Sequence, residues 1–579
     1  MASSPTRRIN VVARHLSLGG PLKDRPPGAD VMENVARSVE DRSTADLTLL
    51  LPGPMDDAQL ATVADLRERK VRVMMNNMAR YTQHGLAGTL AHEQIAAAYA
   101  GTPFGQNFVI PFVFSPHRAQ PYLDWMVILA NNEDCARIAR THVQKSDAYG
   151  FLFLGNGVLS TTDNPLWRAQ RQHLVEAFLP EASLAHVFPV SLRRARFATE
   201  TRLRELTNDF TKPVEINEFW LHEAMAQLQL ALLGETEAWM DRTNIPLRRA
   251  FAAANAQSVD LTTMVARRRK AQKFIRGYAS ELVERATGPA PARAPRHAGA
   301  CPAGGVRGPV TARLADLDAH MAGLNVDADQ ARKKNMARDT AATFLFAGHD
   351  TTANLMTWAT FELARRPELQ ARAHAEVDAA FAKLAREGGA GGRSRDMAYG
   401  DLAPMFPFLA RVLTETLRMW PSVPSGTFRQ LQYDDVIVGR GGQRVTLPKG
   451  TQCAISVWML HQNPDLWKDP ERFDPDRAWL PGEIVGRVGL NPQSHRFCPF
   501  TFEPRSCMGR NFALMEARVL LAHFFRRYDV ALAEPTRSAA PAARRRVTGE
   551  PWIASNYGTL APAQGMHVRL TPRGVAATD

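Results

Sequence analysis

The sequence predicts a mainly α-helical protein that carries small β-sheets. Two apolar runs, NFVIPFVF (107–114) and LDWMVILA (123–130), have the length and composition of strands of one sheet. From NEDCARIART (132–141) to about residue 425, apolar residues recur mostly with the period of a helix. After residue 425 come the strand-like pieces VIVGR, QRVTLP and QCAISV, then a long coil, a helix, and a predicted β-hairpin region from residue 551.

The chain of 579 residues, with 45% hydrophobic and 22% charged residues, has the composition of a globular protein. We expect one large domain over residues 101–579, preceded by an extension over residues 1–100. Within the extension, residues 58–81 have a helical pattern, and a first domain helix is possible near residues 87–100. Residues 286–310, rich in Pro, Gly, Ala and Arg, predict a surface loop, and residues 386–395 a second, shorter one.

The five cysteines are odd in number and widely spread, which argues against a secreted disulfide framework and favours a reducing compartment. The expected location is the cytoplasm. The alternative is an organelle, because the first 23 residues contain Arg and Ser but no acidic residue; a basic tail without a targeting role explains the same composition. No run of 18 apolar residues occurs, so the sequence predicts no transmembrane anchor.

The net charge of +13 includes the basic runs RRRK (267–270) and RRR (544–546). These runs lie far apart and have no interleaved aromatic residues, which argues against a nucleic-acid-binding surface. Solvated helix faces explain them, and docking of an acidic electron-transfer partner is the alternative.

Cys507 is the first candidate for chemistry. It lies in FTFEPRSCMGRNFALME (500–516), just before a stretch with helical periodicity. At a helix N-terminus, free N–H groups and the helix dipole favour a thiolate, and Arg505 adds positive charge. No base for nucleophilic catalysis stands nearby in the sequence, whereas Phe500 and Phe502 offer an apolar wall for a flat ligand. These residues indicate a metal ligand.

The second candidate is a polar notch in the apolar helix predicted over residues 340–364. The notch reads Gly348-His349-Asp350-Thr351-Thr352. Burying an acid and two hydroxyls without partners costs a few kcal/mol, so their place in an apolar helix indicates a function. Gly348 would allow a ligand to approach the backbone. His349 alone is explained as a core histidine and receives no role.

Two further pairs carry little information by themselves. Glu415 and Arg418 are three residues apart on one helix and can form an ion pair. Trp167 and Arg171 are four residues apart, and both can donate hydrogen bonds toward one anionic group.

Together and in this order, the motifs resemble those of the cytochromes P-450, the haem-thiolate monooxygenases. The resemblance runs from about residue 100 to the C-terminus. It is carried by WRAQR (167–171), AGHDTT (347–352), ETLR (415–418), a TFR strand ending in Arg429, DPERFDPDR (469–477) and the cysteine segment.

The resemblance implies the cytochrome P-450 fold and a haem b cofactor with Cys507 as the axial thiolate. It further implies dioxygen chemistry on a small apolar organic substrate, with electrons from a separate reductase or ferredoxin. The implied site residues have three roles: holding the haem (Arg505, Arg429, Trp167 and Arg171, with Phe500 against the ring), relaying protons (Asp350 and Thr351), and forming a structural ionic network (Glu415, Arg418 and Arg472).

The chain departs from the family around the ligand, where the pattern F-G-x-G-x-R-x-C-x-G becomes F-T-F-E-P-R-S-C-M-G. Thr501 and Glu503 replace two glycines. If the second glycine position needs a positive φ, Glu503 carries a strain of about 1–2 kcal/mol. Cys498 is a rival ligand that lacks the arginine and the following helix.

Three alternatives to the monooxygenase stay open. The same fold supports a peroxide-using enzyme, although the Asp350-Thr351 pair argues for proton delivery to dioxygen. The altered loop is compatible with a haem protein that binds without turnover. A nucleic-acid-binding function through the basic runs is the third alternative.

Overall fold

The structure is a computed structural model. It describes residues 107–114, 122–146, 154–162, 164–255, 261–288, 308–323, 335–388, 394–481, 483, 494–539, 553–556, 559–562 and 565–574. The helices expected at 58–81 and 87–100, most of the loop expected at 286–310 and the basic run 544–546 lie outside the described residues.

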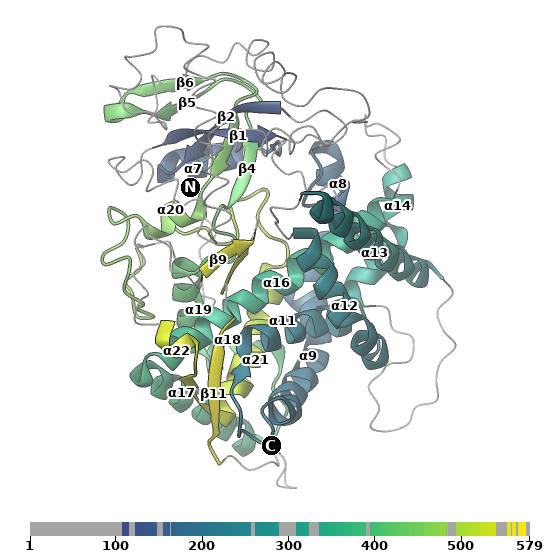
Figure 1. The fold of residues 1–579 in the computed structure, drawn as a ribbon, viewed down its shortest axis with the longest axis vertical. Helices are drawn as coiled ribbons and strands as arrows, with labels where there is room; N and C mark the ends of the chain where they lie inside the picture. Colours follow the sequence, from purple (N-terminus) through teal and green to yellow (C-terminus); the bar gives the residue numbers. More distant parts are fainter. Residues whose placement is uncertain are drawn as a thin grey trace, which may run out of the picture.

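Helices form most of the described structure, and the long helix α16 (Met336–Ala364) runs through its middle (Figure 1). Most residues of α16 on either side of the polar notch are buried, and the helix packs against α11, α13, α19 and α21. The α-helices are α7 (Asn132–Thr141), α8 (Asn164–Leu174), α9 (Ala185–Phe197), α10 (Leu203–Leu206), α11 (Ile216–Gln227), α12 (Glu237–Asn255), α13 (Leu261–Thr287), α14 (Pro309–Gly323), α16, α17 (Pro367–Arg386), α18 (Leu402–Met405), α19 (Pro407–Met419), α20 (Val457–Gln462), α21 (Arg510–Arg527) and α22 (Thr536–Ala539).

Short helical segments extend or join these helices. They are η2 (Val175–Phe178), η3 (Pro180–Leu184), η4 (Ala198–Arg202), η5 (Leu228–Leu232), η6 (Tyr399–Asp401) and η7 (Arg440–Gly442).

Within the described residues, the strands form four small sheets. The largest has the order β1-β2-β7-β4, in which β2 (Tyr122–Leu129) pairs antiparallel with β1 (Phe108–Phe114) and parallel with β7 (Gln452–Ile455). Strand β4 (Thr427–Gln430) closes it antiparallel to β7. The other sheets are β5 (Asp435–Val438) with β6 (Arg444–Leu447), β9 (Ile553–Asn556) with β10 (Thr559–Pro562), and β3 (Val214–Glu215) with β11 (His567–Pro572) and β8 (Tyr528–Leu532).

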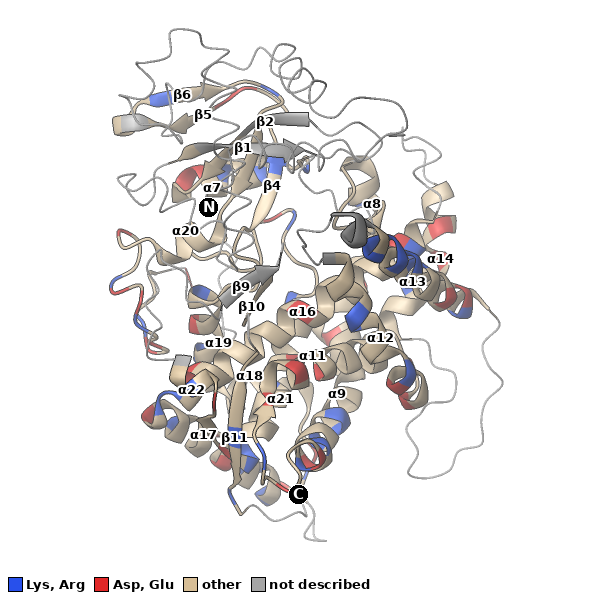
Figure 2. Ribbon diagram, in the orientation of Figure 1, with Lys and Arg blue, Asp and Glu red and all other residues tan. Residues whose placement is uncertain are grey.

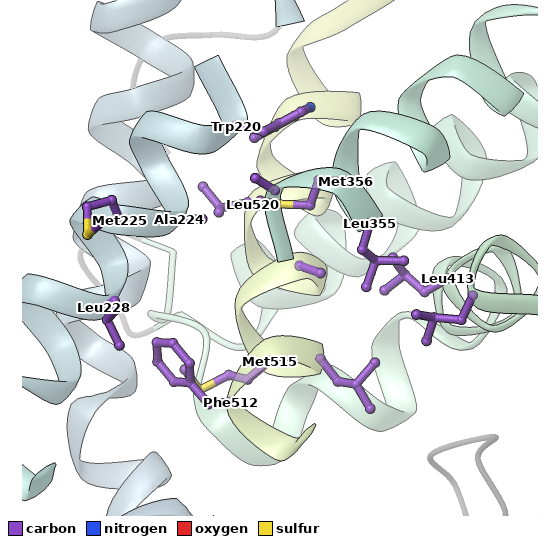
Figure 3. Packing of buried hydrophobic residues seen from close by; sticks show 14 of the residues in the cluster. Trp220, Ala224, Met225, Leu228, Leu355, Met356, Leu413, Phe512, Met515 and Leu520 are labelled. Carbon is purple, nitrogen blue, oxygen red and sulfur yellow. The ribbon is translucent and has the colours of Figure 1, made fainter. Parts of the chain in front are cut away.

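The main hydrophobic core lies where α11, α16, α19 and α21 meet. Figure 3 shows Met225 and Leu228, from α11 and its continuation η5, on one side of α21 and Leu355 of α16 on the other. Phe512 of α21 is also fully enclosed in this core. Burying a large apolar side chain contributes about 1.5–3 kcal/mol, so this cluster fixes α16 and α21 relative to each other.

The fold predicted from the sequence is confirmed: helices dominate, and the strand-like runs at both ends of the helical region pair in small sheets. A Cβ placed at Gly348 would lie 3.1 Å from the Leu228 side chain, so its small size favours close packing of α16 against η5. The expected approach of a ligand to the backbone at Gly348 stays a prediction.

The charged residues lie mainly on the outer helices, as Figure 2 shows for α13. The run at 267–270 belongs to α13, where Arg267, Arg269 and Lys270 are exposed. This placement agrees with a solvated helix face. Within the described residues, no helix combines the length and the hydropathy needed to cross a bilayer.

Candidate functional site

Cys507 lies in the turn immediately before α21. Its thiol is accessible at the protein surface, yet it lies deep among protein atoms, and this burial raises its pKa. The N–H groups of Gly509 and Arg510 and the charges of Arg171 and Arg510 act in the opposite direction. The helix N-terminus thus presents the stabilising groups that the sequence predicted, although burial outweighs them in the free thiol.

The backbone before Cys507 forms a closed loop. The N–H of Cys507 donates to the carbonyl oxygen of Phe500 at 2.9 Å, and the N–H of Thr501 donates to that of Cys498 at 2.9 Å. Phe500 itself is partly buried and packs against the main core. These bonds fix the position of the thiol relative to α21.

The strained residue of this loop is Thr501, not Glu503. Thr501 has a φ of 60°, in the left-handed region, whereas Glu503 is not among the residues with positive φ. A left-handed conformation costs a residue with a Cβ about 1–2 kcal/mol. The Thr501 hydroxyl donates to the carbonyl oxygen of Arg505 at 3.1 Å, and such a bond returns about 0.5–1.5 kcal/mol. The free-energy cost of replacing the first glycine by Thr501 is therefore nearly offset by a hydrogen bond within the loop.

Glu503 takes part in contacts that join the loop to α8. Its carboxylate accepts a hydrogen bond from the Ser506 hydroxyl and lies 3.6 Å from the Arg171 guanidinium. Arg171 donates to the Ser506 carbonyl oxygen at 2.8 Å and to its hydroxyl at 3.2 Å. The structure thus places Arg171 on the residue that precedes Cys507.

Three cations meet on the other side of the loop. Arg429 of β4 and Lys145, which forms an isolated β-bridge with it, both donate to the Thr427 hydroxyl, at 2.7 and 3.2 Å. Arg505 is also buried, and its guanidinium lies 4.0 Å from the centre of the Trp167 ring. Burial, followed by the charges of Arg429 and Arg505, holds the pKa of Lys145 well below its usual range. Buried like charges repel one another, so this arrangement favours an anionic group.

The structure brings Trp167, Arg505 and Arg429 into one region, whereas Arg171, which the resemblance grouped with them, contacts Ser506 and Glu503. Trp167 contributes its ring face to Arg505. Lys145 was missed, because it stands in HVQKSDAYG, which carries no motif; only the β-bridge to Arg429 reveals it.

The polar notch of α16 has hydrogen-bond partners at both of its central residues. The Thr351 hydroxyl donates to the carbonyl oxygen of Ala347 at 2.8 Å. The Asp350 carboxylate accepts from the Asn354 amide at 3.3 Å and from the Thr559 hydroxyl of β10 at 2.5 Å. Thr559 was not predicted, because it reaches Asp350 from a hairpin 209 residues further along the chain.

The ionic network contains Glu415 and Arg418 as predicted, but its third member is Arg477. Glu415 and Arg418 are buried and joined at 2.8 Å, and Arg477 Nε lies 3.2 Å from the Glu415 carboxylate. Arg472 was the wrong choice: its side chain is exposed, and its carbonyl oxygen accepts from Arg418 and Arg477. Both arginines lie in the same turn-rich segment, and the turn directs Arg477 inward.

Cys498, the rival ligand, is placed in a different environment. It is buried in a second apolar cluster with Cys135 and Cys453, and burial raises its pKa. Its N–H donates to His461 Nε2 at 3.0 Å. Cys498 therefore packs in an apolar cluster, whereas Cys507 stands at the N-terminus of a helix.

Comparison with known proteins supports the family that the order of the motifs indicated. The family model "Cytochrome P450" matches residues 126–544. The chain belongs to the cytochrome P450 family.

Among curated cytochromes P450, human "Cytochrome P450 4F8" is 38% identical over 33% of this chain and 33% of its own length. Mouse "Leukotriene-B4 omega-hydroxylase 3" is 35% identical over 37% of each chain. Soybean "Cytochrome P450 97B2, chloroplastic" is 32% identical over 44% of this chain and 42% of its own. The matched region thus spans about a third to two fifths of these relatives.

The residues present in this cytochrome P450 fit haem b, the cofactor of the family. A thiol stands at a helix N-terminus, and the buried guanidinium groups of Arg429 and Arg505, with Lys145 beside them, can donate to two propionates. The predicted family, the predicted fold and the predicted cofactor are confirmed by the family match. The individual roles of the site residues stay predictions.

Proposed function

We propose that the protein is a haem-thiolate monooxygenase that inserts one oxygen atom from dioxygen into an apolar organic substrate. The observation that carries the proposal is the pairing of two features on adjacent core helices. Cys507 stands at the N-terminus of α21, and α16, which packs against α21, carries Asp350 and Thr351. Haem, when bound, supplies the redox chemistry that activates dioxygen.

The protein's own residues hold the cofactor and move protons. Cys507 would bind the iron, and Lys145, Arg429 and Arg505 would bind the propionates. The Thr351 hydroxyl donates to the Ala347 carbonyl oxygen at 2.8 Å in this structure. A hydroxyl can both accept and donate a proton, so Thr351 can pass a proton toward the reaction centre. Asp350 can exchange protons between this region and its surroundings, and Thr559 and Asn354 fix its carboxylate.

The proposal includes a separate electron donor, a reductase or a ferredoxin, as membership of the family implies. It also includes a location in the cytoplasm, with an organelle as the alternative. Because one mouse relative is a leukotriene-B4 omega-hydroxylase, leukotriene B4 is the first substrate to test.

The test begins with the carbon monoxide difference spectrum of the dithionite-reduced protein, with Cys507→Ser as the control. We expect a strongly red-shifted Soret band that the variant lacks. A band typical of histidine or thiol ligation, or no bound haem, would refute thiolate ligation.

Turnover is tested separately, by product formation coupled to oxidation of a reduced nicotinamide through a donor system. Thr351→Ala should release more peroxide and less product per electron pair. If the wild type forms product only from added peroxide, the enzyme is peroxide-using. If it forms none with a panel of lipids, terpenoids and sterols, the monooxygenase proposal fails in favour of a binding protein.

A further inference from the structure

The residue that departs most from the family pattern, Glu503, has contacts that a glycine could not make. Its two carboxylate oxygens point to two different partners, the Ser506 hydroxyl and the Arg171 guanidinium. Ser506 is the residue before Cys507, and Arg171 belongs to α8. Glu503 is thus one corner of a triangle of side chains beside the predicted haem ligand.

Ser506 is the centre of this triangle. Its hydroxyl lies between Glu503 and Arg171, and its carbonyl oxygen accepts from Arg171 at 2.8 Å. Ser506 is buried, whereas the Glu503 side chain is 46% exposed and the Arg171 side chain 20%. A partly exposed ion pair contributes little stability by itself, so the effect of Glu503 lies in positioning and in local charge.

Arg171 donates to the carbonyl oxygen of Ser506, the residue before Cys507, at 2.8 Å, so its positive field acts close to the sulfur. A carboxylate 3.6 Å from this guanidinium offsets part of that field. Removing the carboxylate while keeping the arginine would make the surroundings of Cys507 more positive.

We propose that Glu503 is a positioning residue that fixes Ser506 and Arg171 beside the haem ligand and lowers the reduction potential of the bound haem. The proposal rests on the proposed haem-thiolate function. A more positive site stabilises the reduced state, which carries one more electron than the oxidised state. The potential of a variant without the carboxylate is therefore higher than that of the wild type.

The experiment measures the reduction potential of the haem-loaded protein by spectroelectrochemical titration at low and high salt. Glu503→Gln keeps the size of the side chain and removes its charge, and Glu503→Asp keeps the charge. Glu205→Gln removes an exposed carboxylate on α10 and is the matched control. We expect a shift to more positive potential in Glu503→Gln, smaller at high salt, and little shift in the other two variants.

Hydrogen exchange of the haem-loaded protein gives a second readout that does not depend on redox chemistry. We expect the amides of residues 501–507 to exchange faster in Glu503→Gln than in the control variant. Equal potentials and equal exchange in Glu503→Gln and Glu205→Gln would overturn the inference alone. A wild-type protein without the thiolate band in the carbon monoxide spectrum would overturn the proposed function together with it.

Discussion

Replacing Arg477 should destabilise the protein far more than replacing Arg472, although the two residues are five positions apart. Arg477 donates to Glu415 at 3.2 Å, to the Asp469 carbonyl oxygen at 3.1 Å and to the Arg472 carbonyl oxygen at 2.7 Å. It also donates to the Lys468 carbonyl oxygen. One guanidinium thus connects the buried carboxylate to the whole loop over residues 468–477.

The expected loss in the free energy of unfolding depends on the partners that Glu415 keeps when Arg477 is truncated. Removing one partner of a buried ion pair costs about 3–5 kcal/mol when the other charge is left alone. In Arg477→Ala the Glu415 carboxylate keeps Arg418, so we expect a loss just below this range, about 2–3 kcal/mol. Arg472→Ala removes an exposed side chain and should change the free energy of unfolding by less than about 0.5 kcal/mol.

The assay is urea denaturation of both variants and the wild type, followed by tryptophan fluorescence and by the haem absorption band. The expected result is a clear fall in the urea midpoint for Arg477→Ala and an unchanged midpoint for Arg472→Ala. Arg477→Lys should recover only part of the loss, because an ammonium cannot reproduce the planar fork. Equal shifts in the two alanine variants would refute the assignment of Arg477 to the network.

Three further changes have defined outcomes. Gly277 lies in an open part of α13, so Gly277→Ala should raise the free energy of unfolding by about 0.5–1 kcal/mol in thermal denaturation. Gly157→Ala should lower the free energy of unfolding by about 2 kcal/mol or more, because the new Cβ would lie 2.6 Å from a backbone oxygen of α16. Burial raises the pKa of Glu223, but hydrogen bonds from His222 and Arg194 and their charges outweigh it and lower the pKa to about 2. The stability from Glu223 is therefore present above its usual pKa of 4.5 and is lost as the pH falls toward 2; Glu223→Gln should flatten the acid limb of the pH–stability profile. Under the proposed function, Thr559→Val should increase peroxide released per product by up to about tenfold, with Thr559→Ser close to wild type; unchanged coupling in the valine variant would remove Thr559 from the proton path.

The sequence was sufficient for the architecture and for the position of Cys507 just before a helix. Cys507 could be found because a cysteine, an arginine and a helical pattern follow one another locally. Glu415 and Arg418 could be paired because one helix turn sets their distance.

Residues that depend on irregular backbone could not be found in this way. The choice between Arg472 and Arg477 depends on the turns between residues 469 and 477, which carry no periodicity. The positive φ at Thr501, one glycine position before the expected Glu503, depends on how the loop closes. Lys145 and Thr559 reach the site through contacts with residues far away in the sequence, which local patterns cannot predict.

The sheet order β1-β2-β7-β4 has a consequence for assembly of the protein. Its parallel pairing joins residues 126–129 with residues 452–455, so a loop of several hundred residues must close before Lys145 and Arg429 can meet. Pairings between distant segments form late, because the entropy of loop closure must be overcome before they contribute stability. The packing of α21 against α9 closes a loop of similar length, so we expect the binding site for the anionic edge of a cofactor to be completed together with the long-range helical contacts, late in folding. The rate of cofactor incorporation then depends on formation of the β1-β2-β7-β4 sheet. A strand variant that slows β2–β7 pairing would delay incorporation even with every ligand residue intact.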